Sequence, residues 1–290
     1  MASSEPSKAV RPSVEELASF IRKDALGRPK VMGIVNVTND SFYEDSRYNP
    51  KQAIKAALEM WDLGVDWIDI GGESTRPGSK EISSEKELKR VIPIIKKIKS
   101  LIPNILISID TKKPEVAKEA INAGALMIND VSGLRDPEMF KLILSERIPV
   151  CIMHMQNNPE DMQVSPDYDD CLGEVSNYLF SKADELIKRG FPQELIILDP
   201  GIGFGKLLEH NLELLRGTEK LRRDTFSVLN GVSRKSMIGE ITNRRSASDR
   251  LAGTLGASAY AQINGIDILR VHDVKEHIDL SNVLSSLING

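Results

Sequence analysis

The chain has 290 residues of ordinary globular composition, enough for one large α/β barrel or for two modest domains. A net charge of −4 gives no basic footprint for nucleic acid, and the sequence lacks a long apolar run or a signal-peptide pattern, so we expect no membrane contact. Without a basic footprint, we expect small molecules as partners. The two cysteines of the chain cannot form a disulfide framework, which favours a cytoplasmic protein.

Residues 1–28 differ from the rest of the chain. They hold Ser, Pro and mixed charges around one amphipathic run, Val14 to Ile21. We therefore expect a loosely attached N-terminal extension over residues 1–28 and a single domain over residues 29–290.

From residue 31 onward, short apolar runs alternate with amphipathic helical segments. The apolar runs have the length of strands: Val31–Val35, Trp67–Ile70, Ile105–Ile109, Ala125–Ile128, Ile148–Met153, Leu195–Leu198, Phe226–Leu229 and Ile266–Val271. The helical patterns between and after them are Pro50–Asp62, Glu85–Leu101, Pro114–Ala123, Pro137–Glu146, Tyr168–Arg189, Leu207–Thr218, Ser248–Asn264 and Val274–Ile288. This repeated alternation predicts an α/β fold, the (β/α)8 TIM barrel, with a doubly wound open sheet as the alternative.

In such barrels the reactive groups lie at the carboxyl ends of the strands. Polar residues follow nearly every predicted strand: Asn36, Gly71-Gly72-Glu73, Asp110, Asn129, His154, Asp199, Lys235 after a short loop, and Arg270 with His272. Each alone fits a loop residue, a helix cap or a buried core histidine. A ring of carboxylates, carboxamides and cations at one rim is better explained by a ligand site.

The residue types in this ring indicate the chemistry of the ligand. Asp110, Asn129 and Asp199 can accept hydrogen bonds from a heterocycle with adjacent N–H groups. Lys235 can donate to the carbonyl or ring nitrogen of the same heterocycle. Of the neighbours at 129 and 130 only one can face the mouth of the barrel. We choose Asn129, which leaves Asp130 as a turn or cap residue.

A second group of residues suits an anion. Arg270 and His272 are two apart on a predicted strand, so they share a face and can bind a multiply charged anion. Asn36 can add an oxygen ligand for Mg²⁺ on that anion. Ser236 is at a predicted helix start, where a hydroxyl and free N–H groups can receive a carboxylate or simply cap the helix.

Three loops lie at the same rim. Residues 38–44 and 74–78 have the composition of mobile connecting loops. Glycines at 201, 203 and 205 follow Asp199 and let the backbone approach a ligand. This third loop is not a P-loop, because Leu207 stands where Ser or Thr is required after Lys206.

Residues 30–288 closely resemble the dihydropteroate synthases, the folate-pathway enzymes that sulfonamides inhibit. The shared motifs are MGIVNVT at 32–38 with DSF at 40–42, GGESTRPG at 71–78, SIDT at 108–111, INDVSG at 128–133, MHMQ at 153–156, DPGIGFGK at 199–206, SRKS at 233–236 and RVHDV at 270–274. The resemblance implies a TIM-barrel transferase that condenses 6-hydroxymethyl-7,8-dihydropterin pyrophosphate with p-aminobenzoate, releasing pyrophosphate and 7,8-dihydropteroate. It also implies Mg²⁺ as cofactor and a homodimer.

The resemblance further assigns residues to each substrate. The pterin residues would be Asp110, Asn129, Met153, Asp199 and Lys235. The pyrophosphate residues would be Asn36, Arg76, Arg270 and His272, with Asn36 also meeting the metal. The aminobenzoate residues would be Phe42, Thr75, Arg76, Pro77, Phe204, Lys235 and Ser236. The implied mechanism is SN1-like: pyrophosphate leaves first, carboxylates stabilise the pterin-methylene cation, and the aniline nitrogen then attacks. The catalytic residues would be Asp110, Lys235, Arg270 and His272.

The first loop departs from the family pattern, with Asn39 in place of Pro and Tyr43-Glu44-Asp45-Ser46 in place of Ser-Asp-Gly-Gly. Two other functions stay open. One is a barrel that moves a methyl group from methyltetrahydrofolate to a corrinoid protein, and the other is a catalytically silent relative that binds pterin. Small residues at 252–259 suit a dimer interface, but they also suit packing of that helix on the barrel.

Overall fold

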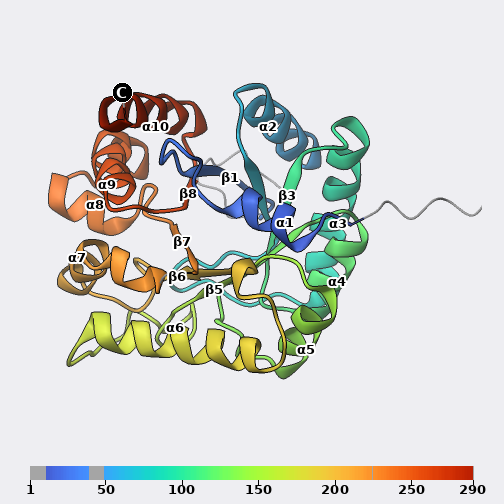
Figure 1. The fold of residues 1–290 in the computed structure, drawn as a ribbon, viewed down its shortest axis with the longest axis horizontal. Coiled ribbons are helices and arrows are strands. Elements are labelled where there is room, and N and C mark those ends of the chain that lie inside the picture. Colours follow the sequence, from blue (N-terminus) through green and yellow to red (C-terminus); the bar gives the residue numbers. More distant parts are fainter. Residues whose placement is uncertain (1–10, 39–48, 224, 290) are drawn as a thin grey trace, which may run out of the picture.

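The structure, a computed structural model, describes residues 11–38, 49–223 and 225–289. Eight parallel strands in these ranges close into a barrel in chain order, and helices surround it (Figure 1). The strands are β1 (Lys30–Asn36), β2 (Trp67–Gly71), β3 (Leu106–Asp110), β4 (Met127–Asp130), β5 (Val150–Met153), β6 (Ile196–Asp199), β7 (Ser227–Asn230) and β8 (Ile268–Val271). The predicted (β/α)8 barrel is confirmed, and the open-sheet alternative is wrong because β1 pairs with β8.

The helices of the described ranges agree with most of the predicted segments. They are α1 (Val14–Ile21), α2 (Pro50–Asp62), α3 (Ser84–Leu101), α4 (Pro114–Asn122), α5 (Pro137–Glu146), α6 (Cys171–Lys188), α7 (Leu208–Arg216), α8 (Ser236–Thr242), α9 (Leu251–Ile263) and α10 (Val274–Asn289). α6 begins three residues later than predicted, because the Asp170 carboxylate caps it by accepting from the N–H of Gly173. α8, predicted only as a helix start at Ser236, is a helix of its own.

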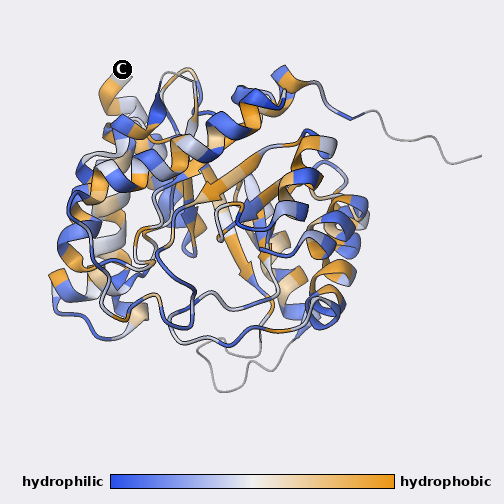
Figure 2. Ribbon diagram, turned by 90° about the horizontal axis from the view of Figure 1, so that it is seen from below, coloured by the Kyte–Doolittle hydropathy of each residue, from blue (hydrophilic) through white to orange (hydrophobic). Residues whose placement is uncertain are grey.

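The strands are buried on both faces, so their side chains alternate between two apolar layers. Inward side chains from the first half of the strands form the core of the barrel: Met32, Trp67, Met127, Cys151, Ile197, Leu229 and Ile268. Outward side chains pack against the helices. Figure 2 shows the result as orange strands in the middle of the molecule and blue turns toward solvent. The polar groups are thereby left at the carboxyl ends of the strands.

α1 closes the barrel at the end where the strands begin. Its last residue, Ile21, is fully buried in the same cluster as Trp67. The Trp67 indole N–H donates to the Phe20 carbonyl at 2.7 Å. This packing differs from the loose attachment that we expected for residues 1–28, and its cause is the apolar face of α1. The first ten residues lie outside the described ranges.

No helix in the described part of the chain is both long and apolar enough to cross a bilayer.

Candidate active site

The structure brings the predicted pterin residues to one end of the barrel. Asp110 and Asn129 are paired in the β3–β4 register, and Met153 and Asp199 are paired in the β5–β6 register. Each of the four is more than nine-tenths buried. Because they stand at or next to the last residue of their strands, their side chains meet at the carboxyl end of the barrel.

Asn129 and Asp130 take the two roles predicted for them. The Asn129 amide nitrogen donates to the buried Asp69 carboxylate at 3.2 Å. The Asp130 carboxylate instead accepts from the N–H groups of Ser132 at 2.8 Å and Leu134 at 2.9 Å. Asp130 is therefore a turn residue, whereas the Asn129 side chain faces Asp69 inside the barrel, and its contact with a pterin stays a prediction.

Arg270 forms the centre of the site. Its Nε lies 2.6 Å from Asp69 Oδ2, and its Nη2 lies 2.6 Å from Asp110 Oδ2. The Asp69 Oδ2 atom also accepts from Asn129. One guanidinium and one carboxylate thus connect β2, β3, β4 and β8. The predicted contact of Arg270 with pyrophosphate stays a prediction, since the guanidinium faces these carboxylates.

Asp69 was not among the predicted site residues, although the sequence holds a signal for it. The residue stands inside the apolar strand Trp67–Gly71 and is fully buried. A charge inside a buried strand needs a partner. The period of two places Asp69 on the same face as Gly71 at the strand end, and this points the carboxylate into the barrel.

Burial changes the charge balance of this network. It raises the pKa of Asp110 to about 7, although the Arg270 guanidinium opposes the shift. Burial also disfavours the Arg270 cation, but the carboxylates of Asp69 and Asp110 outweigh it and raise the pKa of the guanidinium. Arg270 therefore stays charged at neutral pH, whereas Asp110 titrates close to neutrality.

Lys235 stands beside the glycine-rich loop and interacts with Asp199. Its ammonium group donates to the Ile202 carbonyl and lies 4.5 Å from the centre of the Phe204 ring. Burial lowers the pKa of Lys235 to about 8, against the opposing charge of Asp199. Burial raises the pKa of Asp199, and Lys235 is the strongest charge that opposes this rise. The two opposite charges thus act on each other's pKa.

The glycine at position 201 is required by a close approach of two backbones. Its φ is +67°, and a Cβ there would stand 1.8 Å from the carbonyl oxygen of His154. Its N–H donates to Asp199 Oδ1 at 2.7 Å. The loop therefore lies against the end of β5 and holds the Asp199 carboxylate in place.

The predicted anion residues lie at the same end. His272 Nδ1 is 3.0 Å from the Ser233 hydroxyl. Burial, followed by the charges of Arg270 and Arg234, lowers the pKa of His272 to about 4, so its ring is neutral at pH 7. The charge of Arg76, an exposed residue of the second loop, also acts on His272.

The predicted aminobenzoate residues are spread over three segments around the mouth. Thr75, Arg76 and Pro77 follow β2, Phe204 follows β6, and Ser236 is the exposed first residue of α8. Phe42 lies outside the described residues, as does the altered part of the first loop.

Asn36 has the position expected of a ligand for Mg²⁺ at an open site. It is the exposed last residue of β1, and its Oδ1 reaches over Gly71, the register partner of Asp110. Residues 11–38, 49–223 and 225–289 contain no cluster of three His, Cys, Asp or Glu that could hold a metal. A lone amide oxygen fits Mg²⁺, which takes most of its ligands from phosphates and water.

A buried ion network fixes the base of the second loop. Lys113 Nζ lies 2.6 Å from Glu73 Oε2 and 2.7 Å from Glu87 Oε2. The Glu73 carboxylate also accepts from the N–H of Ile82 at 2.9 Å, which closes the neck of the loop at 74–81. Glu73, named above among the rim residues, thus anchors the loop that carries Arg76.

Comparison with known proteins agrees with this geometry. Residues 32–272 match the family described as pterin binding enzyme. The dihydropteroate synthase of Escherichia coli (strain K12) is 43% identical over 266 residues, which cover 91% of this chain and 94% of that protein. The chain belongs to the dihydropteroate synthase family.

Two solved dihydropteroate synthases share the fold and most of the length. The Yersinia pestis enzyme, solved with a sulfonamide drug complex, has a TM-score of 0.86 and 38% identity over 91% of this chain and 96% of that one. The Xanthomonas albilineans enzyme, solved in complex with 7,8-dihydropteroate, has a TM-score of 0.81 and 37% identity over 91% of this chain and 95% of that one.

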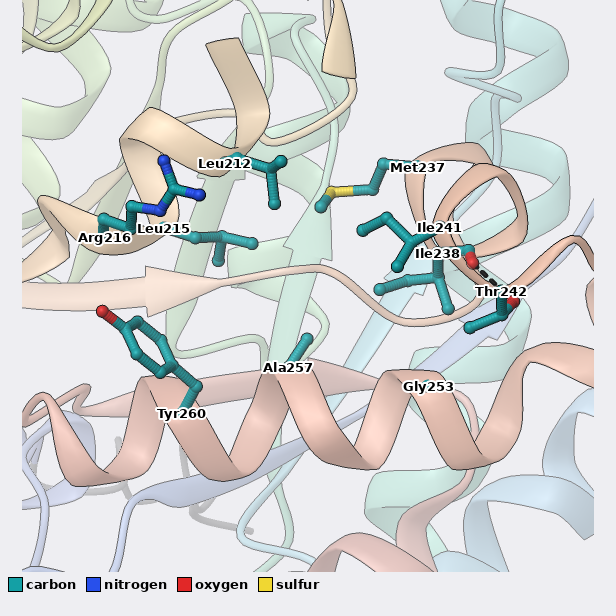
Figure 3. A pocket seen from close by; sticks show the side chains of 10 residues that line it. All are labelled: Leu212, Leu215, Arg216, Met237, Ile238, Ile241, Thr242, Gly253, Ala257 and Tyr260. Carbon is teal, nitrogen blue, oxygen red and sulfur yellow. Dashed lines mark hydrogen bonds between the residues drawn. The ribbon is translucent and has the colours of Figure 1, made fainter. Parts of the chain in front are cut away.

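A hollow in the surface lies away from the carboxyl ends of the strands. It measures about 310 Å³ and opens between α7, α8 and α9 (Figure 3). Its lining is mostly apolar: Leu212, Leu215, Arg216, Met237, Ile238, Ile241, Thr242, Gly253, Ala257 and Tyr260. None of the predicted site residues lines it.

Replacing Lys113 with Met should lower the free energy of unfolding by about 3 kcal/mol, because the fully buried Glu87 carboxylate loses its cation and Glu73 is left with its longer contact with Lys112. Urea denaturation measures the change. Lys55→Met is the control, since its ion pair with Glu59 is exposed and its loss should barely move the midpoint. Equal effects of the two substitutions would contradict a stabilising network at Lys113.

Proposed function

We propose that the chain condenses 6-hydroxymethyl-7,8-dihydropterin pyrophosphate with p-aminobenzoate to give 7,8-dihydropteroate and pyrophosphate. The observation that carries the proposal is the network of Arg270, Asp69 and Asp110 beside Asn129, at the strand ends of a barrel from the dihydropteroate synthase family. The Xanthomonas albilineans relative was solved with 7,8-dihydropteroate, the product proposed here.

The pterin would be recognised by a fixed set of acceptors and one donor. The Asn129 amide nitrogen is already used by Asp69, so its oxygen is the atom left for an N–H group of the ligand. Asp199 would accept from the neighbouring N–H groups, and Lys235 would donate to the pterin carbonyl or ring nitrogen. Met153 would pack against the ring.

The proposed reaction is SN1-like. The C–O bond between the pterin methylene and pyrophosphate breaks first, and its electron pair leaves with pyrophosphate. The carboxylates of Asp110 and Asp199 stabilise the remaining carbocation in a site from which water is largely excluded. The neutral aniline nitrogen then attacks this carbon, and the resulting ammonium group gives its proton to water. Since no side chain acts as a nucleophile, the protein contributes orientation and electrostatic stabilisation.

The leaving pyrophosphate would meet His272 and Arg76, with Arg270 behind them. Neutral His272 can donate an N–H to a phosphate oxygen without being charged. Asn36 would give one oxygen to Mg²⁺, which offsets the charge of the leaving group when it is bound. Arg270, held by Asp69, would also keep Asp110 oriented toward the reacting carbon.

The two alternatives explain less of the site. Methyl transfer from a folate has no use for His272 and the Arg76 loop, because it releases no multiply charged anion. A silent relative is supported only by the altered first loop. The described site residues are all retained, and the departures of the first loop at 39 and 43–46 fall outside the described ranges.

We also infer that two copies associate through the late helices. Two apolar side chains that line the hollow of Figure 3 are exposed, Ile241 at 54% and Tyr260 at 43%. Ile263, at the end of the same helix as Tyr260, is 62% exposed. The small residues have mixed roles. A Cβ on Gly253 would meet Ile238 of α8 at 2.7 Å, so this glycine packs two helices of one copy, whereas Gly256 faces open space. A cytoplasmic location stays a prediction.

The purified protein should release pyrophosphate from dihydropterin pyrophosphate only when Mg²⁺ and p-aminobenzoate are both present. Lys235→Ala should lower kcat/KM about 100-fold or more, because a donor to the pterin is lost. Lys275→Ala, an exposed position on α10, is the matched control and should keep full activity. If pterin pyrophosphate bound without any condensation, the silent-relative hypothesis would replace this one.

Multi-angle light scattering should return the mass of two chains at micromolar concentration. Ile263→Asp should shift the protein toward one chain, because it puts a charge in the apolar face. A mass of one chain for the unsubstituted protein would refute the proposed dimer.

The pH profile of kcat/KM for pterin pyrophosphate should be bell-shaped, with limbs near 7 and 8. Activity rises as Asp110, whose pKa is raised to about 7, becomes a carboxylate. It falls as Lys235, whose pKa is lowered to about 8, loses its proton. Lys235→Arg should remove the alkaline limb, since arginine keeps its charge there. An unchanged alkaline limb in this variant would exclude Lys235 as its source.

A further inference from the structure

A buried lysine, Lys206, donates hydrogen bonds to the backbone of the glycine-rich loop and to His154. Lys206 ends the motif DPGIGFGK, and only 3% of it is exposed. Its Nζ lies 3.0 Å from His154 Nδ1, 2.9 Å from the carbonyl oxygen of Phe204 and 3.4 Å from that of His154. These three acceptors match the three N–H donors of an ammonium group, with the His154 proton on Nε2.

Ion pairing does not explain why this position holds a lysine. The acceptors of Lys206 are neutral, whereas those of Lys113 are carboxylates. Burial lowers the pKa of Lys206 to about 7. Burial and the Lys206 charge together lower the pKa of His154 to about 3, so the histidine stays neutral. Burying an ammonium group among neutral acceptors costs free energy. The role of this group is therefore to donate three directed hydrogen bonds.

The contact with the Phe204 carbonyl connects Lys206 to the candidate site, because Phe204 is one of the predicted aminobenzoate residues. Further bonds hold the loop on both sides of Phe204: the Tyr168 hydroxyl donates to the Gly205 carbonyl at 2.8 Å, and the Gly203 N–H donates to the Asn211 side chain at 2.6 Å. With its backbone fixed, Phe204 presents its ring to Lys235 at 4.5 Å.

We propose that Lys206 is a positioning residue for p-aminobenzoate: its bond to the Phe204 carbonyl holds the Phe204 ring beside Lys235, where the second substrate has to lie. This role rests on the proposed function. On the pterin side Lys206 is one of several groups that act on Asp199, because Lys235, the Gly201 N–H and Arg270 each lower the pKa of that carboxylate more than Lys206 does.

Steady-state kinetics of Lys206→Met tests the proposal, since methionine fills similar space without a donor. The KM for p-aminobenzoate should rise about tenfold, because the partly buried Phe204 carbonyl loses its donor and Phe204 is released. The kcat and the KM for pterin pyrophosphate should stay within about twofold. Lys99→Met is the control, because Lys99 also donates to two carbonyls, those of Pro103 and Ile105, at the opposite end of the barrel. It should change no kinetic constant.

A double-mutant cycle shows whether Lys206 acts through Phe204. Phe204→Ala alone should also raise the KM for p-aminobenzoate, and adding Lys206→Met should raise it by no more than about twofold further. Independent, multiplicative effects would overturn the proposal. So would an equal rise in the KM for pterin pyrophosphate.

A crystal structure of Lys206→Met separates this proposal from the proposed function, because it needs no activity. The Phe204 ring should leave Lys235 while the barrel stays unchanged, and a ring still in place would overturn the positioning role. If the methionine variant does not fold, Lys206→Gln, which keeps one donor group, takes its place in both measurements. An unsubstituted protein that releases no pyrophosphate would refute the synthase function but leave the structural test valid.

Discussion

The mouth of this barrel depends on one cation shared by two carboxylates. Arg270 lies within 2.6 Å of both Asp69 and Asp110, and each of the three would be too costly to bury alone. Asp69 also orients the Asn129 amide. The positions of the pterin groups are therefore coupled, because moving any one of them leaves a buried charge or hydrogen-bonding atom without its partner.

Charge is distributed along the site in the way that the proposed chemistry needs. Carboxylates are concentrated in the depth of the barrel, where Asp69, Asp110 and Asp199 are at least nine-tenths buried. Arg76, an exposed cation, and His272, a neutral donor, lie nearer to solvent. Arg270 offsets part of the buried negative charge. A pterin cation would nevertheless face carboxylates, whereas the pyrophosphate anion would meet the Arg76 cation and the N–H of neutral His272.

The sequence predicted the barrel and most of the site because both follow from local patterns. Short apolar runs between capped helices reveal the strands, and the residue after each run reveals the rim. Asp69 is not found in this way, because it lies two residues before the end of its strand; its signal is instead a charge inside an apolar run. Glu73 follows a strand as a site residue would, yet the cation that turns it into a loop anchor, Lys113, comes from forty residues later. Such a pairing is a property of the tertiary structure.

The packing of α1 has a consequence for synthesis on the ribosome. The helix covers the beginning of the strands, and the residues just after it reach the far end of the chain: Arg22 donates to the Thr225 carbonyl, and the Lys23 N–H donates to Asp267. β1 likewise has β8 as a neighbour. Part of the apolar surface of α1 and β1 thus stays uncovered until Asp267 and β8 have been translated. Contacts of this sequence separation make folding slow, and the nascent chain is a natural client for chaperones that bind exposed apolar segments.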